Sequence, residues 1–363
     1  MKGVGTALAT ATFALIIGSL HAQENSPFKF RSGVELINVT ATVSDADGRF
    51  VPNLTQDDFL VYEDDQPVEV SHFTAERVPV SLGIALDTSG SMAGEKMNAA
   101  RAAIGRFVNE LLDRNDELFL YRFSNYPALV QGWTRDRRQL LEPLDRLTPN
   151  GATAMYDAVA RAIPLAQQGQ NRKKALVVIS DGNDTSSKTE IRDLKEQIRQ
   201  SEVIVYAVGI DAAETGDAPP KRTPISPPPT PRPVPIPLPF PGAPRGGFGR
   251  TPPSTPPVAG PGAPGIGSPG NGTTPWQRAG LDDRVNISAL RDMTDDSGGR
   301  TEIIRAPRDL DPATAGIADE LSKQYYFGYQ SPLAKKDGRW HSIRVEVRNR
   351  SYRVRARKGY FAS

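Results

Sequence analysis

The sequence VPVSLGIALDTSGSM, residues 78–92, contains the strongest structural pattern in this chain. Its first part, residues 78–86, is almost entirely apolar and uncharged, which is typical of a strand buried on both faces of a parallel sheet. The apolar run stops at Asp87, and Ser89 and Ser91 follow at alternating positions with a glycine between them. A carboxylate and two hydroxyls therefore lie on one short loop at the carboxyl end of a strand, where open α/β sheets hold their binding sites.

Taken alone, this loop also fits an ordinary helix cap, because Ser, Thr and Asp are common in caps and turns. Two further loops of the same kind follow along the chain. The segment GATAMYD, residues 151–157, opens a predicted helix, and LVVISDG, residues 176–182, ends a second apolar strand in another carboxylate. We expect the three loops to converge at the carboxyl edge of one sheet.

Together the three loops resemble the metal-ion-dependent adhesion site, or MIDAS, of the von Willebrand factor type A (VWA) domain. By this resemblance the metal ligands are Asp87, Ser89, Ser91, Thr153 and Asp181, and each position holds the residue type that the motif requires. The resemblance also implies a bound cation with one open coordination position, which an acidic side chain of a partner protein completes.

The chemistry of these side chains restricts the metal. Hard oxygen ligands without sulfur or histidine select Mg²⁺, Mn²⁺ or Ca²⁺ over zinc and copper. Because several of the ligands are neutral hydroxyls, the cation would keep much of its positive charge and attract a carboxylate. We therefore expect Mg²⁺ as the cofactor, with Mn²⁺ or Ca²⁺ as alternatives.

The composition excludes several classes of function. The chain has 363 residues, enough for more than one domain, with 44 basic and 42 acidic residues. This balance creates no strong field that would attract nucleic acid or a membrane, so we expect no nucleic-acid partner. Cysteine is absent, which excludes disulfides, thiolate metal sites and cysteine catalysis.

Residues 1–22 have the pattern of a secretory signal peptide. Lys2 precedes an apolar run, and Ala22 supplies a small residue at the predicted cleavage position. A retained membrane anchor is the alternative, but the run is short for a membrane span and is interrupted by Gly18. We expect an exported protein, periplasmic, on the outer surface or secreted, with no transmembrane segment after signal cleavage.

Residues 78–323 alternate predicted strands and helices, which implies a parallel sheet with helices on both faces. The expected fold class is α/β, with a doubly wound, mostly parallel, Rossmann-like sheet, as the resemblance to the VWA domain also implies. The expected strands are 78–86, 118–123, 175–179, 203–210 and 301–304. The expected helices are 97–111, 154–165, 191–198, 287–293 and 314–321.

A Pro/Gly-rich insertion, residues 215–278, interrupts this alternation. About two thirds of the 32 prolines of the chain lie within residues 219–275. Such a segment cannot bury enough apolar surface to fold, so we expect it to be disordered. Because the α/β pattern resumes afterwards, the segment is predicted to be an insertion inside a domain.

The flanking segments, residues 28–75 and 324–363, have the alternating pattern of β-strands. Each is too small to fold alone, so we expect them to pair into one small β-sandwich-like domain into which the α/β domain is inserted. This arrangement resembles the bacterial "VWFA-related" proteins, in which NVTATVSDADGRFVPNLTQDDFLVYEDD-like and YYFGYQS-like segments flank the A domain. The expected strands are 37–43, 59–63, 68–73, 325–329, 342–347 and 352–356.

Several arginines of the C-terminal segment are expected to share one strand face. The sequence leaves two interpretations open: a solvated face, or a patch that makes weak contact with acidic envelope polymers. These arginines are Arg344, Arg348, Arg353, Arg355 and Arg357.

The resemblance predicts an adhesion-type, metal-dependent module that binds a protein ligand through an exposed Asp or Glu. The alternatives are a passive cell-envelope scaffold with a structural metal and a Mg²⁺-dependent hydrolase. Hydrolysis would require a positioned base, yet the histidines, His21, His72 and His341, lie outside the predicted sheet.

We therefore expect no enzyme activity and no catalytic residue. Three other acidic residues lie near the predicted metal loops. Asp157 is interpreted as a first-turn helix residue, and Glu95 and Asp184 as charges at the rim.

Overall fold

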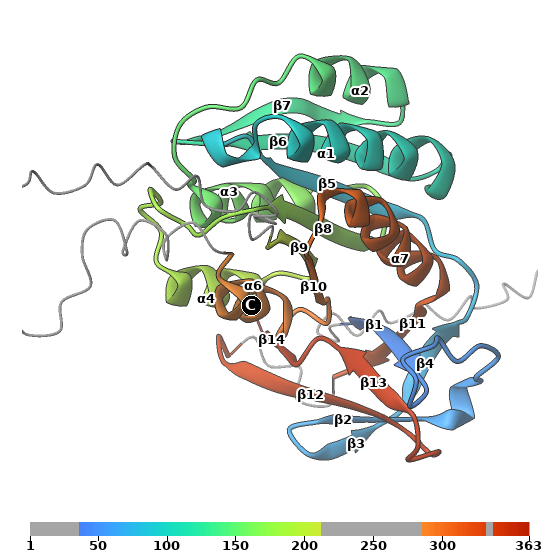
Figure 1. Cartoon of the computed structure of the whole chain (residues 1–363). Helices are drawn as coiled ribbons and strands as arrows, with labels where there is room; N and C mark the ends of the chain where they lie inside the picture. Colours follow the sequence, from blue (N-terminus) through green and yellow to red (C-terminus); the bar gives the residue numbers. More distant parts are fainter. Residues whose placement is uncertain (1–35, 212–284, 332–336, 363) are drawn as a thin grey trace, which may run out of the picture.

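The computed structural model describes residues 36–211, 285–331 and 337–362, which form an α/β unit and a β-sandwich. Figure 1 shows the two units side by side. The expected fold class is confirmed, because a mostly parallel central sheet is accompanied by antiparallel sheets. The predicted signal peptide and the predicted Pro/Gly-rich insertion lie outside the described residues.

The α/β unit is built on a six-stranded sheet with the order β10-β9-β8-β5-β6-β7. Neighbouring strands are parallel except for β6 and β7, which pair antiparallel at one edge. The strands are β5 (Val80–Asp87), β6 (Glu117–Phe123), β7 (Pro127–Thr134), β8 (Lys173–Ser180), β9 (Ile204–Ile210) and β10 (Thr301–Ile304).

Helices cover both faces of this sheet. Every residue of β5 is buried, and its side chains alternate between two cores: Leu82 and Ile84 pack on one face, Ala85 on the other. One face is covered by α1 (Glu95–Arg106), the π-helical turn η3 (Phe107–Leu111), α2 (Arg137–Asp145) and α7 (Leu310–Lys323). The other is covered by α3 (Met155–Gln167), α4 (Ile191–Gln200) and α6 (Ile287–Thr294). The short helical turns are η1 (Gln56–Asp58), η2 (Gly90–Met92) and η4 (Pro307–Asp309).

The sequence pattern predicts neither β7 nor α2. The strand β7 lies at the sheet edge and is mostly half-buried, so it lacks the continuous apolar run of a central strand. In α2, only Leu140 and Leu144 are buried, and Pro143 interrupts the helical pattern.

The β-sandwich consists of two four-stranded sheets, which enclose a single core. One sheet has the order β13-β1-β11-β4 and the other β14-β12-β2-β3. Strands from before and after the α/β unit alternate in the first sheet, and in the second β12 pairs with β2 across the two flanks, so neither flank forms a sheet alone. The strands are β1 (Leu36–Ser44), β2 (Phe59–Glu63), β3 (Gln66–Val68), β4 (Val70–Thr74), β11 (Tyr325–Gln330), β12 (Trp340–Val347), β13 (Arg353–Ala356) and β14 (Gly359–Phe361).

The single strand predicted at 68–73 is wrong. The chain leaves β3 at Val68 and enters β4 at Val70, and these strands belong to different sheets. The strand β3 pairs only with β2, across the hairpin turn at Asp64 and Asp65, because Pro67 suits an edge strand. The strand β4 pairs instead with β11.

The predicted arginine face is also not formed. Arg344 lies on β12 of one sheet, whereas Arg353 and Arg355 lie on β13 of the other. Arg357 is only 9% exposed, and Arg355 points into the interface between the two units. These arginines therefore do not share one strand face.

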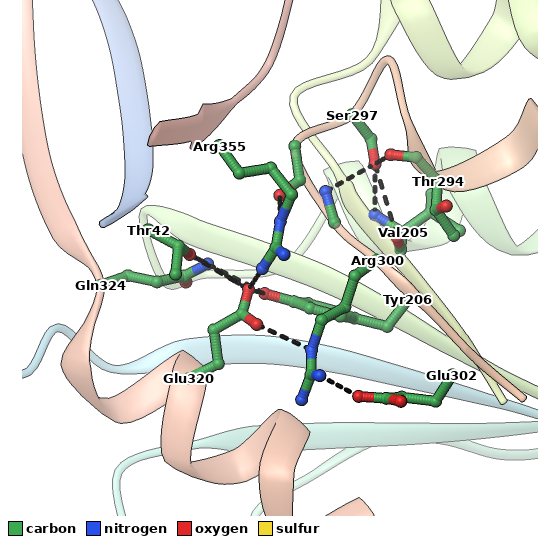
Figure 2. Close-up of polar contacts among 12 residues, drawn as sticks. Thr42, Val205, Tyr206, Thr294, Ser297, Arg300, Glu302, Glu320, Gln324 and Arg355 are labelled. Atoms are coloured by element: carbon green, nitrogen blue, oxygen red, sulfur yellow. Dashed lines mark hydrogen bonds and ion pairs between the residues drawn. The ribbon is translucent and has the colours of Figure 1, made fainter. Parts of the chain in front are cut away.

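A buried carboxylate, Glu320, joins the two units (Figure 2). Its Oε1 atom accepts hydrogen bonds from Tyr206 Oη at 2.9 Å, from Thr42 Oγ1 at 3.1 Å and from Arg355. Its Oε2 atom forms an ion pair with Arg300 Nε at 2.9 Å. Thr42 and Arg355 belong to the sandwich, while Tyr206, Arg300 and Glu320 itself belong to the α/β unit.

A second polar contact joins the units on the side of α4. Asp296 bonds Arg199 at 2.7 Å and Lys358 at 3.0 Å, which places one sandwich residue and one helix residue on the same carboxylate. The following turn contains Gly298, whose φ is +85°. A Cβ atom there would lie 2.7 Å from the carbonyl carbon of Ala356, so only glycine permits this close approach of the two units.

We predict that Glu320→Ala destabilises the protein by about 3 kcal/mol, because the substitution leaves partly buried guanidinium groups without their carboxylate. The matched control is Asp319→Ala, whose side chain is 54% exposed and pairs only with Lys323 within the same helix. The control should cost less than about 0.5 kcal/mol. Urea unfolding of the full chain measures both changes, and equal effects would contradict a special role for Glu320.

Lys173 is a buried charge at the start of β8, only 1% exposed. Its Nζ atom donates a hydrogen bond to Leu321 O near the end of α7, at 2.7 Å. Burial lowers the pKa of Lys173 from 10.5 to about 8, and the nearby Arg77 charge acts in the same direction.

This shift predicts that stability rises with pH above pH 8. Between about 8 and 10.5 the folded protein has released the Lys173 proton while the unfolded chain still holds it, so raising the pH favours the folded state. The gain is at most about 3 kcal/mol. The gain is measured by comparing the unfolding free energies of wild type and Lys173→Met at pH 7.5 and pH 10. If the difference between the two proteins is the same at both pH values, the lowered pKa of Lys173 is refuted.

Candidate metal centre

The predicted site residues leave the sheet at one edge. Asp87 is the last residue of β5, and Asp181 directly follows β8, its parallel neighbour, in which Ile179 is in register with Leu86. Ser89 is the N-cap residue of η2, which follows β5, and Ser91 lies within η2. Thr153 lies immediately before α3 and is 5% exposed.

Hydrogen bonds connect the first and third loops directly. Ser91 Oγ donates to Asp181 Oδ1 at 2.8 Å, and Ser89 Oγ lies 3.0 Å from Ser91 Oγ. Beneath them, Ser180 Oγ donates to Asp87 Oδ2 at 2.6 Å. Ser89 N donates to Asp87 Oδ1 at 2.7 Å, so the two carboxylates and the two serines form one hydrogen-bonded cluster.

The second loop packs against both of the others. Gly90 N donates to Gly151 O at 2.9 Å, which holds the second loop against the first. A Cβ atom on Gly182 would lie 3.8 Å from Thr153 Oγ1, so the threonine hydroxyl is next to the Asp181 loop. Thr185 N donates to Thr153 O at 2.8 Å and fixes the backbone there. All five predicted residues thus lie around one edge of the sheet.

The electrostatics of this edge favour a cation. The side chains of Asp87 and Asp181 are buried, at 0% and 2% exposure. Burial raises the pKa of Asp87 to about 6, and the Asp181 charge adds to this, although hydrogen bonds from Ser180 and Ser89 oppose it. Two buried carboxylates in one cluster repel each other, and a bound cation would relieve that repulsion.

The donor set fits a hard divalent cation that is held mainly through oxygen. In the parts of the chain that the structure describes, no group of three or more His, Cys, Asp or Glu side chains lies close enough together to hold a metal. A metal at this edge would therefore depend on the hydroxyls of Ser89, Ser91 and Thr153 as well as on the two carboxylates. Mg²⁺ and Mn²⁺ accept such oxygen ligands, together with water.

The structure adds one residue that the sequence analysis missed. Lys96 Nζ lies 2.5 Å from Asp181 Oδ2, and the lysine side chain is 24% exposed while that of Asp181 is fully buried. Lys96 is the second residue of α1, which begins directly after the first loop. Its contact spans 85 residues of sequence, so no local pattern reveals it.

The other acidic residues near the site hold the loops together. The structure confirms Asp157 in the first turn of α3. Burial raises its pKa, but hydrogen bonds from Thr189 and Lys188 outweigh this and leave the pKa below its usual range. Asp184 is not a free charge at the rim, because its Oδ2 accepts from Tyr156 N at 2.8 Å and from the hydroxyl of Ser187.

Neither histidine among the described residues lies at this edge. His72 is on β4, where its ring faces Tyr326 edge-on. His341 is on β12, where Asp64 and Asp337 bond its two nitrogens at 2.8 and 3.2 Å. Both strands belong to the sandwich.

Residues 82–183 match the family model of the von Willebrand factor type A domain. This match and the observed sheet topology show that the α/β unit has a VWA-type fold. The chain is 23% identical over 147 residues to the inter alpha-trypsin inhibitor heavy chain 4 of Mus musculus, covering 36% of this chain. It spans only 16% of the length of that relative.

Solved structures show similar chains. The conserved hypothetical protein BatB from Bacteroides thetaiotaomicron is 18% identical, with a TM-score of 0.42, covering 67% of this chain and 98% of that one. A von Willebrand factor type A protein from Catenulispora acidiphila is 13% identical, with a TM-score of 0.43, covering 92% of this chain and 74% of that one. The helices within the described residues include none that is long and apolar enough to span a membrane.

Proposed function

We propose that this protein is an exported, metal-dependent binding module that recognises an acidic residue of a partner protein. VWA domains commonly mediate protein–protein interaction or adhesion. The observation that carries the proposal is the cluster of Asp87, Ser89, Ser91 and Asp181, joined by hydrogen bonds of 2.7, 2.8 and 3.0 Å at the carboxyl edge of the sheet. Export is supported by the signal-peptide pattern of residues 1–22.

In this proposal, Asp87, Ser89, Ser91, Thr153 and Asp181 hold one Mg²⁺ or Mn²⁺. When bound, the cation supplies a Lewis-acidic position that a carboxylate oxygen occupies more strongly than water does. The protein's own residues orient that position: the buried carboxylates fix it at the sheet edge, and the exposed Ser91 opens it towards solvent.

Binding is favoured over hydrolysis by the groups around the site. Asp157 and Asp184 accept hydrogen bonds from backbone amides and hydroxyls, which occupies them as structural acceptors. A general base for water would need a free lone pair near the substrate. The neighbouring surface, which includes the exposed Ala93 and Thr185, would instead contact the partner.

We predict that Asp181→Ala abolishes measurable binding of Mg²⁺ and Mn²⁺ without unfolding the domain, because the cation loses one of its two charged ligands. Calorimetric titration of the full chain measures this. The matched control is Asp193→Ala on α4, which removes an equal charge whose side chain is 61% exposed. Wild-type affinity in Asp181→Ala would show that the site is assigned wrongly.

We further predict that the partner binds through one Asp or Glu side chain. Replacing that residue by its amide should weaken binding more than tenfold, the size of a lost interaction worth about 1.4 kcal/mol. EDTA should abolish binding, whereas moderate salt should leave it largely intact, because direct coordination is screened less than a contact between surface charges. Binding that persists in EDTA would favour the scaffold interpretation, with the metal serving structure alone.

A further inference from the structure

We propose that Lys96 is a built-in competitor for the metal site: its ammonium neutralises Asp181 in the metal-free protein and must leave before Asp181 can ligate a cation. This inference rests on the proposed metal-binding function and assigns Lys96 to the regulation of the same site.

Lys96 contacts Asp181 directly. Lys96 Nζ lies 2.5 Å from Asp181 Oδ2, while the other oxygen, Oδ1, accepts the hydrogen bond from Ser91 Oγ at 2.8 Å. Both oxygens of this fully buried side chain are thus engaged by the protein. A carboxylate that gives one oxygen to an ammonium has only part of its charge available for a metal.

Lys96 lies in the first turn of α1. The amino terminus of an α-helix carries partial positive charge. An acidic side chain in the first turn, such as Glu95, therefore stabilises the helix, and a basic side chain there destabilises it. Local electrostatics therefore disfavour a lysine at the second position of α1. The ion pair with Asp181, on a strand end far along the chain, compensates for this.

The Lys96 side chain is free to move towards solvent. It is 24% exposed, whereas Asp181 is enclosed. The ammonium can therefore exchange Asp181 for water at the rim by rotating its flexible stem, with no rearrangement of the apolar core. The carboxylate has no such alternative and needs either the lysine or a cation.

These arguments predict two effects of opposite sign. Lys96→Met should lower the melting temperature of the metal-free protein, because Asp181 then remains buried without a cation beside the Asp87 carboxylate. The same variant should bind Mn²⁺ about tenfold more tightly than wild type, since no internal cation has to be displaced. A residue with a purely structural role would show only the first effect.

The experiment titrates Mn²⁺, and separately Mg²⁺, into the EDTA-stripped full chain by calorimetry, and records melting curves with and without the metal. Lys188→Met is the matched control, because it removes an exposed charge on the Asp181 loop. The backbone amide of Lys188, which the substitution keeps, donates a hydrogen bond to Asp157. The control should bind as wild type does, so any general effect of net charge is subtracted. Should Lys96→Met fail to fold, Lys96→Gln removes the charge, keeps a hydrogen-bond donor and carries the same expected tightening.

The outcomes separate the inference from the function it rests on. If the Lys96 variants bind Mn²⁺ as wild type does, or more weakly, Lys96 does not compete and the inference is wrong, while metal binding stands. If Lys96→Met binds the metal and wild type does not, the competition is confirmed in its strongest form. If neither binds, the inference and the proposed function both fail.

Discussion

The hydrogen bonds and ion pairs of the Glu320 carboxylate hold the two units of this molecule together. The carboxylate is buried where a helix of the VWA domain meets two strands of the sandwich, and both units supply its partners (Figure 2). A buried carboxylate tolerates few arrangements, since each lost partner leaves an unsolvated charge. Thr42 and Arg355 can bond Glu320 only when β1 and β13 are positioned beside α7. The Glu320 carboxylate therefore selects one orientation of the sandwich relative to the VWA domain.

The proposed metal site lies at the other end of the same parallel strands, and backbone hydrogen bonds between its loops shape it without any ligand. Asn150 N bonds Thr88 O at 2.8 Å, and Ala154 N bonds Ser124 O at 2.7 Å, which ties the second loop to the ends of β5 and β6. The oxygen cluster is therefore largely preorganised, and little conformational entropy would be lost when a cation enters. The exception is Lys96, the one flexible side chain that contacts a proposed ligand.

The sequence pattern predicts the structure correctly where burial imposes a simple periodicity. Strands buried on both faces, such as β5 and β9, appear as continuous apolar runs, and the loops at their ends then follow from parallel topology. It failed where neighbours far along the chain decide the outcome. Nothing local shows that the chain changes sheets between Val68 and Val70, that Arg355 turns inward to Glu320, or that Lys96 meets Asp181.

The route by which the VWA domain joins the sandwich has a mechanical consequence. The chain enters the domain from β4 and returns from it into β11, and these two strands are antiparallel neighbours, with Thr74 opposite Tyr326 (Figure 1). A force applied at the carboxyl edge of the central sheet is therefore shared between two anchored strands rather than carried by one linker. Tension applied between residues 36 and 362 has another path within the sandwich, through the pairing of β1 with β13. The sandwich therefore offers a load path between its own strands that does not run along the chain of the α/β unit.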